Sequence, residues 1–79
     1  MRSEHLAREA ERLKHDEVLN KALDDIRREM LNELALANAD DKTMILRLQQ
    51  GVKVIDEIRN VLDRYIMAAD VQEEAGSFV

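Results

Sequence analysis

Adjacent carboxylates are the first residues in this sequence whose types and spacing could support acid–base chemistry or metal binding. They include the pairs Asp24-Asp25, Asp40-Asp41, Asp56-Glu57 and Glu73-Glu74. Consecutive side chains on a helix point about 100° apart, so such pairs do not readily share a proton or a metal ion. We interpret them as solvated helix faces and helix caps.

The hydroxyl and imidazole groups lack the neighbours that catalysis or metal binding requires. A hydroxyl nucleophile needs a base within hydrogen-bond reach. The hydroxyl groups are those of Ser3, Thr43, Tyr65 and Ser77, near the termini, a turn or the packing face of a helix. His5 and His15 lie ten residues apart on a charged stretch, and cysteine is absent. We therefore expect no catalytic, cofactor-binding or metal-binding residues.

Composition and charge favour an all-helical protein. Of the 79 residues, 46% are hydrophobic and 37% are charged, and proline is absent, which is typical of helical hairpins and coiled coils. The net charge is −5, so attraction to nucleic acid or to an anionic membrane is not expected. The N-terminal stretch is too acidic for a signal peptide, and no apolar run would span a bilayer. We expect a soluble, intracellular protein.

The segment 44–69 is the strongest helix in the sequence, because its apolar residues recur at intervals of three and four. They form two neighbouring rows along the predicted helix. The first row is Ile45, Leu48, Val52, Ile55 and Leu62, and the second is Met44, Ile58, Val61 and Tyr65. Both rows together are too wide to be left in water, so other helices must cover them.

The preceding residues supply an N-terminal arm and a helix that pairs with this segment. The arm is residues 1–15, where the apolar stripe is thin. The apolar phase changes near Asp16, which is a natural N-cap. Either a new helix starts there or one long helix rotates its buried face, and we favour a break. The new helix would run from Glu17 to about Ala37.

The polar turn at residues 38–41 predicts an antiparallel helical hairpin, because so short a connection forces its two helices to lie side by side. Asn38 tolerates the left-handed conformation at a helix end, and Asp40 or Asp41 can cap the second helix. We assign the hairpin to residues 16–70 and a flexible tail to residues 71–79.

Gly51 lies inside the second helix, where glycine costs about 1 kcal/mol relative to alanine. Close approach of the two helices beside Met30 explains this residue better than a functional hinge does. Counting outward from the turn gives the expected register of the hairpin. It places Leu34 near Ile45 or Leu48, Met30 near Val52, Ile26 near Ile55, and Leu19 near Leu62.

One hairpin cannot cover both rows of the second helix, so we expect a homo-oligomeric helical bundle. Burial of large apolar side chains, at about 1.5–3 kcal/mol each, would drive its assembly. The predicted oligomer interface is Met44, Leu48, Val52, Ile55, Ile58, Val61, Leu62 and Tyr65. A larger partner protein is expected to contact Leu6 and Leu13 in the arm, and Phe78 and Val79 at the end of the tail.

Four segments carry a family resemblance: residues 16–23 (DEVLNKAL), the acidic turn Asp40-Asp41, residues 47–50 (RLQQ) and residues 55–62 (IDEIRNVL). Together they resemble a group of small helical proteins of tailed bacteriophages and prophages. The resemblance implies a phage-encoded protein of the head and DNA-packaging neighbourhood, located in the host cytoplasm or associated with the virion. Most members of that group have no assigned activity, so the resemblance implies no catalytic residue.

We predict a non-enzymatic phage structural or assembly factor that acts through protein–protein interaction. A small acidic inhibitor or regulator of a host protein is an alternative. It predicts an acidic surface formed by Asp24, Asp25, Glu29, Asp56, Glu57 and Asp63. A DNA-packaging recognition subunit is a second alternative, although the net charge makes direct nucleic-acid binding unexpected. It predicts a basic ring or groove formed by Arg27, Arg28, Arg47 and Lys53.

Overall fold

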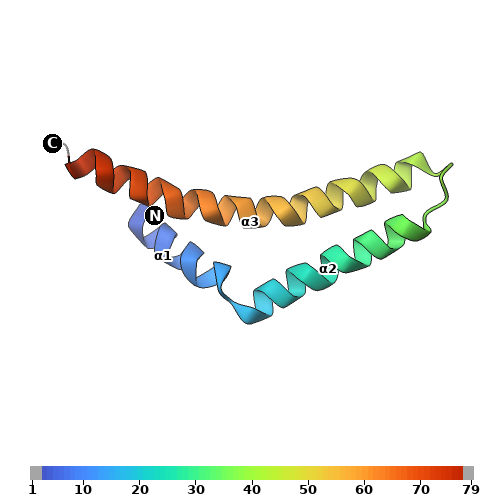
Figure 1. Cartoon of the computed structure of the whole chain (residues 1–79), viewed down its shortest axis with the longest axis horizontal. Coiled ribbons are helices and arrows are strands. Elements are labelled where there is room, and N and C mark those ends of the chain that lie inside the picture. The colour runs from blue at the N-terminus through green and yellow to red at the C-terminus, as the bar shows by residue number, and fades with distance from the viewer. Residues whose placement is uncertain (1–2, 78–79) are drawn as a thin grey trace. The chain divides into compact units, whose positions relative to one another are not determined.

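Three α-helices make up the protein in a computed structural model that describes the backbone of residues 3–77 and the side chains of residues 3–69 (Figure 1). The helices are α1 (Ser3–Lys14), α2 (Glu17–Leu36) and α3 (Lys42–Ser77). No strand occurs within residues 3–77. The prediction of an all-α fold is confirmed.

The chain divides into two compact units, and α3 contributes to both. One unit comprises Met1–Asp16 together with Arg59–Val79, and the other is Glu17–Ile58. We call the first the terminal unit and the second the central unit. The terminal unit therefore combines α1 with the last part of α3, and the central unit combines α2 with the first part of α3.

The predicted break between the first two helices is present. Helix α1 ends at Lys14, and the backbone N–H of Asp16 donates a hydrogen bond of 3.1 Å to the carbonyl of Leu13. This bond closes a tight turn, and α2 then begins at Glu17. The change of apolar phase in the sequence thus marks a real helix boundary.

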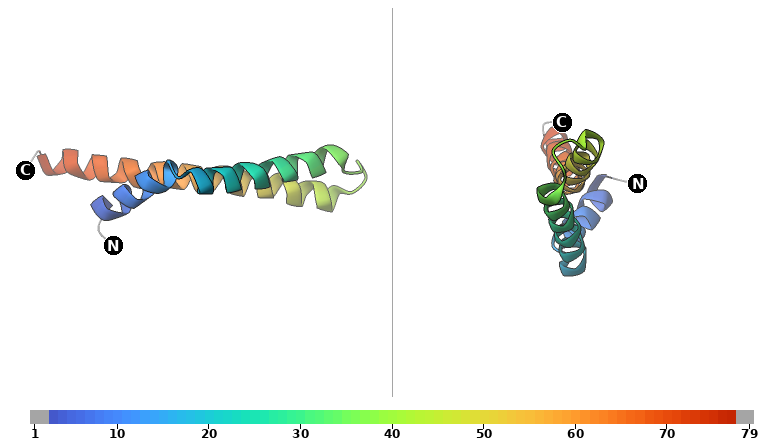
Figure 2. Two further views of the ribbon diagram at one scale, coloured as in Figure 1. Left: turned by 90° about the horizontal axis from the view of Figure 1, so that it is seen from below. Right: turned by 90° about the vertical axis from the view of Figure 1, so that its right-hand side faces the viewer.

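The connection between α2 and α3 is stabilised by the side chains of its own polar residues, and it lies at one end of the central unit (Figure 2). Asp41 Oδ1 accepts a hydrogen bond of 3.1 Å from the backbone N–H of Met44, which is the bond of an N-cap residue. Asn38 Oδ1 accepts one of 3.3 Å from the backbone N–H of Asp40. The predicted cap at Asp41 is confirmed.

Asn38 ends α2 by a different route from the one that we expected. No residue in the described part of the chain has a positive φ, so Asn38 does not adopt the left-handed conformation. Its side chain instead forms the Asx-type bond to Asp40, and its carbonyl accepts a 2.9 Å bond from the N–H of Asp41. The chain thus turns after α2 through hydrogen bonds to the side chain and the carbonyl of Asn38, without a left-handed residue.

Helix α3 extends further than the apolar pattern indicated. Its last residue is Ser77, whereas we placed the end of the hairpin at residue 70. The residues after Ala69 include Gln72, Glu73 and Glu74, which favour helix, and proline is absent. Loss of apolar periodicity removes the signal for burial but does not end a helix. Phe78 and Val79 lie outside the described residues.

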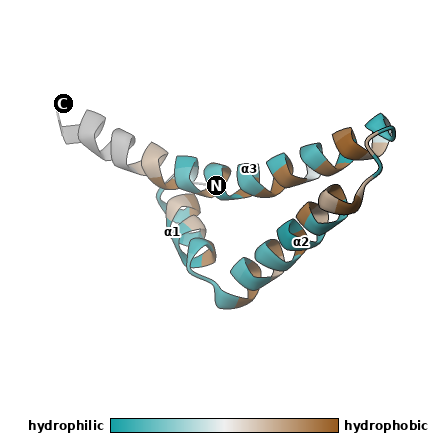
Figure 3. Ribbon diagram, turned by 45° about the vertical axis from the view of Figure 1, so that its right-hand side comes forward, coloured by the Kyte–Doolittle hydropathy of each residue, from teal (hydrophilic) through white to brown (hydrophobic). Residues whose placement is uncertain are grey.

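The core of each unit is small. Among the described side chains, those less than about a tenth exposed are Ala10 and Ala69 in the terminal unit and Leu23, Leu48 and Ile55 in the central unit. No described large side chain is fully enclosed, and no described polar residue is buried. Figure 3 shows the corresponding pattern, in which apolar residues form narrow stripes between hydrophilic stretches of each helix. Among the side chains of residues 3–69, neither unit encloses a core of the size that usually stabilises a domain.

Gly51 lies where α3 passes close to α2 in the central unit. A Cβ atom added at Gly51 would overlap Met30 Sδ, and it would stand 3.5 Å from Met30 Cε and 3.9 Å from Met30 Cγ. The predicted close approach beside Met30 is confirmed. Glycine is present at this position because the thioether of Met30 occupies the space that a larger side chain would need.

Candidate interaction surface

An ion pair joins α2 to α3 within the central unit. Arg27 Nε donates a hydrogen bond of 3.0 Å to Asp56 Oδ1, with the two side chains 38% and 47% exposed. A pair this open to water contributes no more than about 1 kcal/mol to stability. It shows that residue 27 of α2 lies beside residue 56 of α3. The DNA-packaging alternative assigned Arg27 to a basic ring or groove, and its guanidinium is paired with the Asp56 carboxylate.

A second group of charges pairs along the surface of α2. Lys21 Nζ donates a hydrogen bond of 2.8 Å to Asp25 Oδ2, and Arg28 Nη1 lies 3.7 Å from Asp25 Oδ1. The hydrogen bond from Lys21 lowers the pKa of Asp25 below its ordinary value. Asp25 is therefore a carboxylate held by two cations of its own helix.

The terminal unit has an equivalent link between α1 and α3. Lys14 Nζ lies 2.8 Å from Asp63 Oδ1, and each side chain is about half exposed. The hydrogen bond to Asp63 and its negative charge raise the pKa of Lys14 above its ordinary value. This pair ties the last turn of α1 to α3.

These pairs bear directly on the acidic surface that an inhibitor would present. Asp25, Asp56 and Asp63 each lie beside a basic side chain of the same unit. Asp24 and Glu57 also have polar or electrostatic interactions within the chain. The acidic residues are therefore interleaved with bases, an arrangement that weakens the field that such a surface would project.

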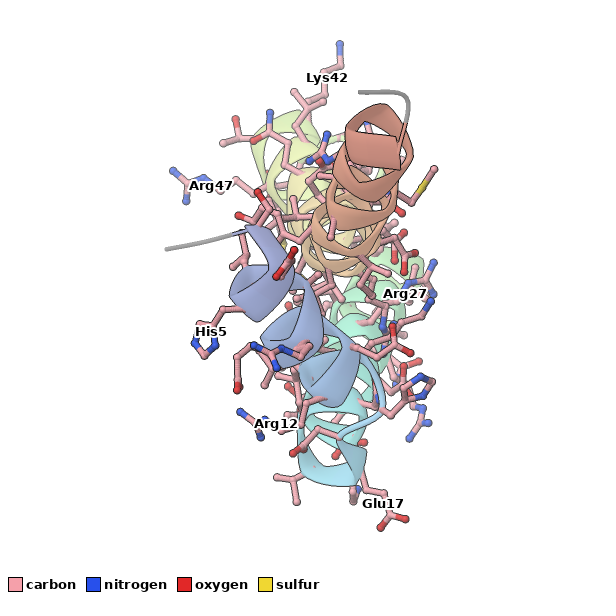
Figure 4. The ribbon with its side chains drawn as sticks, turned by 90° about the vertical axis from the view of Figure 1, so that its left-hand side faces the viewer. His5, Arg12, Glu17, Arg27, Lys42 and Arg47 are labelled. Atoms are coloured by element: carbon pink, nitrogen blue, oxygen red, sulfur yellow. The ribbon has the colours of Figure 1, made fainter. Side chains whose placement is uncertain are left out.

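The four basic residues proposed for a nucleic-acid groove are not gathered at one place. Arg27 and Arg28 are paired with Asp56 and Asp25. Arg47 extends to the opposite side of the central unit from Arg27 (Figure 4). A shallow depression is present on α2, and its lining residues are Asp24, Arg27, Arg28 and Leu31. All four belong to a single helix, so the depression is a feature of its surface.

Two of the predicted interface residues lie in the core of the central unit. Leu48 is 9% exposed and Ile55 is 7% exposed. These two side chains are already covered within one chain, and Val52 on the same row is half-buried. The first apolar row of α3 is thus the face that this chain covers with its own residues.

The second apolar row remains open to solvent over much of its area. Ile58 is 38% exposed, Tyr65 is 39% exposed and Met44 is 42% exposed. Val61, the remaining member of this row, is half-buried, as is Leu62 of the first row. Met44, Ile58 and Tyr65 of the predicted interface are therefore left partly in water by a single chain.

Val54 belongs to this open face and was not among the residues that we selected from the sequence. It is 57% exposed, and it lies four residues before Ile58 on α3. The signal was its spacing, because four residues is one of the two intervals that keep a helical face continuous. We define the exposed row as Val54, Ile58, Val61 and Tyr65.

A smaller apolar cluster flanks the connection between α2 and α3. Leu36, the last residue of α2, is 87% exposed, and Leu46 near the start of α3 is 57% exposed. Leu36 belongs to an apolar helix end, because α2 finishes with Leu34, Ala35 and Leu36. These residues add to the apolar surface that one chain leaves in water.

The residues expected to contact a larger partner are only partly described. Leu6 and Leu13 are half-buried on α1, and Phe78 and Val79 lie outside the described residues. His5 projects from α1 on the side of Arg12 (Figure 4), and His15 Nε2 lies 3.1 Å from Glu11 Oε1. Within residues 3–69, no group of three or more His, Cys, Asp or Glu side chains could hold a metal ion.

Comparison of the chain with known proteins identified no related protein. No protein-family model matches the chain, and neither the curated proteins nor the solved structures contain a significant match. In the described part of the chain, no helix combines the length and the apolar character needed to cross a bilayer.

Proposed function

We propose that this protein is a non-enzymatic structural or assembly factor that works by presenting helical surface to copies of itself and to a larger protein. The observation that carries the proposal is the area of the chain that remains in contact with water. Its accessible surface is 6378 Å². A compact monomer of 9.1 kDa is expected to expose about 4,900 Å².

The excess of about 1,500 Å² per chain is large on the scale of protein interfaces. A stable interface of standard size removes about 800 Å² from each partner. One or two such interfaces would therefore bring this chain to the exposure of an ordinary folded protein. The small cores of both units make the same point, because each has few apolar residues to hold it together alone.

The architecture that fits this function is an antiparallel helical hairpin with an N-terminal helical arm, assembled into a bundle. Two contacts between α2 and α3 support the hairpin. Residue 27 meets residue 56, and residue 30 meets residue 51, so the partner number falls as the residue number rises. This order is that of antiparallel helices, and the capped turn at Asp41 joins them.

The biological setting that we propose is a tailed bacteriophage or prophage, at the stage of head assembly or DNA packaging. The resemblance of residues 16–23, 47–50 and 55–62 to small phage proteins supports this setting. The protein would act in the cytoplasm of the host, or in association with the virion. The ion pairs Lys14–Asp63, Lys21–Asp25 and Arg27–Asp56 agree with a structural role, because they join or brace the helices.

The mass of the native chain in solution tests this proposal. Light scattering on a size-exclusion column at micromolar concentration should give a discrete multiple of 9.1 kDa. A folded monomer at the same concentration would contradict self-association. In that event, the apolar surface would belong to a complex with a different protein, as the inhibitor alternative requires.

A further inference from the structure

We propose that the exposed row of α3 is covered by the same row of a second copy, with the two α3 helices antiparallel. Val54 of one copy would then lie opposite Tyr65 of the other, and Ile58 opposite Val61. This inference rests on the proposed self-association and specifies its geometry. It does not depend on the phage setting.

The spacing of the row is the first argument for this orientation. Val54, Ile58, Val61 and Tyr65 are separated by four, three and four residues. This order of intervals reads the same in both directions, so reversing one helix brings every member of the row opposite another member. Intervals of four and three residues are those between successive core positions of a heptad repeat, which is the pattern that packs two helices side by side.

The sizes of the side chains favour the antiparallel arrangement over the parallel one. Antiparallel pairing places Tyr65, the largest side chain of the row, opposite Val54, the most exposed and among the smallest. A parallel pair related by a two-fold axis would place Tyr65 against Tyr65 and Val54 against Val54. Pairing large with small fills the layers more evenly, because interfaces pack to the density of protein interiors.

The charges beside the row point to the same orientation. Glu57 and Arg64 lie seven residues apart, so they occupy equivalent positions along one edge of the row. In the antiparallel pair, this edge of one helix lies beside the same edge of the other helix, and the two run in opposite directions. Glu57 of each copy therefore lies near Arg64 of the other. In a parallel pair the edge would instead meet the opposite edge of the row, where Ile55 and Leu62 stand.

Two such pairs would form in each dimer. Glu57 and Arg64 also have interactions within their own chain, so pairing across the interface exchanges one partner for another. The main effect of the Glu57–Arg64 pairing is therefore to favour the antiparallel orientation of the two helices, because charge complementarity gives specificity more than affinity. The apolar row supplies the attraction, since its members leave much of their area in water.

The test uses the absence of cysteine from the native chain. We would prepare Val54→Cys and Tyr65→Cys as separate full-length chains and treat them, alone and mixed, with a short thiol cross-linker. The antiparallel pair predicts efficient cross-linking in the mixture and little in either chain alone. Residues 54 and 65 are separated by about 16 Å along a helix, so like cysteines would lie too far apart. Circular dichroism would confirm that both variants remain helical.

A charge reversal provides an independent measurement that leaves the apolar row intact. Glu57→Arg or Arg64→Glu alone should raise the dissociation constant of the dimer about tenfold, and the double variant should return it to within about threefold of the native value. Reversal of Lys42, an exposed residue at the start of α3 and twelve residues before Val54, serves as the control for a change of charge alone.

The outcomes separate this inference from the proposed function. Cross-linking of each cysteine chain with itself, without a cross-link between residue 54 of one chain and residue 65 of the other in the mixture, would show a parallel pair. This result would overturn the inference while leaving self-association in place. A native oligomer that cross-links in neither experiment would show that another face forms the interface, which also overturns it. A native chain that is monomeric at micromolar concentration would overturn both proposals.

Discussion

Replacing Gly51 by alanine tests the contact that sets the spacing of α2 and α3. The backbone of Gly51 is helical without a positive φ, so alanine fits its conformation. Helix propensity alone would then stabilise the protein by about 1 kcal/mol. The added Cβ would, however, overlap the Met30 thioether, with Met30 Cε 3.5 Å away.

Met30 must therefore change its rotamer when Gly51 carries a methyl group. Met30 is half-buried, so moving it forfeits part of the roughly 1.5–3 kcal/mol that full burial of a methionine provides. We expect this loss, about 1 kcal/mol, to cancel the gain in helix propensity. Gly51→Ala should accordingly leave the free energy of unfolding nearly unchanged.

The same substitution should stabilise a chain that already carries Met30→Ala. With the thioether removed, the gain in propensity is realised, so Gly51→Ala should raise the free energy of unfolding by about 1 kcal/mol in that background. The assay is urea unfolding followed by circular dichroism at one fixed chain concentration, because association changes apparent stability. Gln50→Ala, at an exposed neighbouring position, is the matched control.

The reasoning fails if the two substitutions are independent. A gain of about 1 kcal/mol from Gly51→Ala with Met30 present would show that the thioether moves without cost. A loss of several kcal/mol in both backgrounds would show that something other than Met30 requires glycine. Either result would remove Met30 as the cause of the close approach.

Three further predictions concern single interactions of the described residues. In a double-mutant cycle, Arg27→Ala and Asp56→Ala should show a coupling of about 0.5–1 kcal/mol, and additivity would contradict a stabilising pair. Asp41→Ala should lower the free energy of unfolding by about 1 kcal/mol through loss of the cap on α3. Asp41→Asn should keep most of the stability that the cap provides, because asparagine also caps helices. Asp63 raises the pKa of Lys14, so the stability from this pair is fully present below pH 10.5 and declines as the pH rises through the raised value. Lys14→Gln should remove that alkaline decline from the pH profile of unfolding, and an identical profile would contradict the pairing.

Local chemistry allowed much of the fold to be predicted from the sequence. The break at Asp16 and the cap at Asp41 follow from side chains that bond to nearby backbone groups, so no distant residue is needed to foresee them. Gly51 could be matched to Met30 because a short turn fixes the register of the helices that it joins. These predictions depend on spacing along one or two helices.

The coverage of each helix face could not be predicted in the same way. Apolar periodicity indicates which residues share a face, but it does not say which neighbour covers them. Leu48 and Ile55 were therefore grouped with an oligomer interface although one chain already buries them, and Ile26 was placed near Ile55 although Ile26 is 45% exposed. Val54 lies four residues before Ile58 and so continues the second row, but its 57% exposure follows from which helices cover α3, which spacing alone does not show.

The measurement that tests the central claim most directly is the mass of an Ile58→Asp chain by sedimentation equilibrium, compared with the native chain and with Asn60→Asp. Both variants add one negative charge to α3, but Asn60 is exposed and lies off the exposed row. We predict that the native chain and Asn60→Asp form the same oligomer. Ile58→Asp should be monomeric or unfolded, because an unpaired carboxylate would be placed in the packed interface. An Ile58→Asp chain with the native mass and melting temperature would contradict the account.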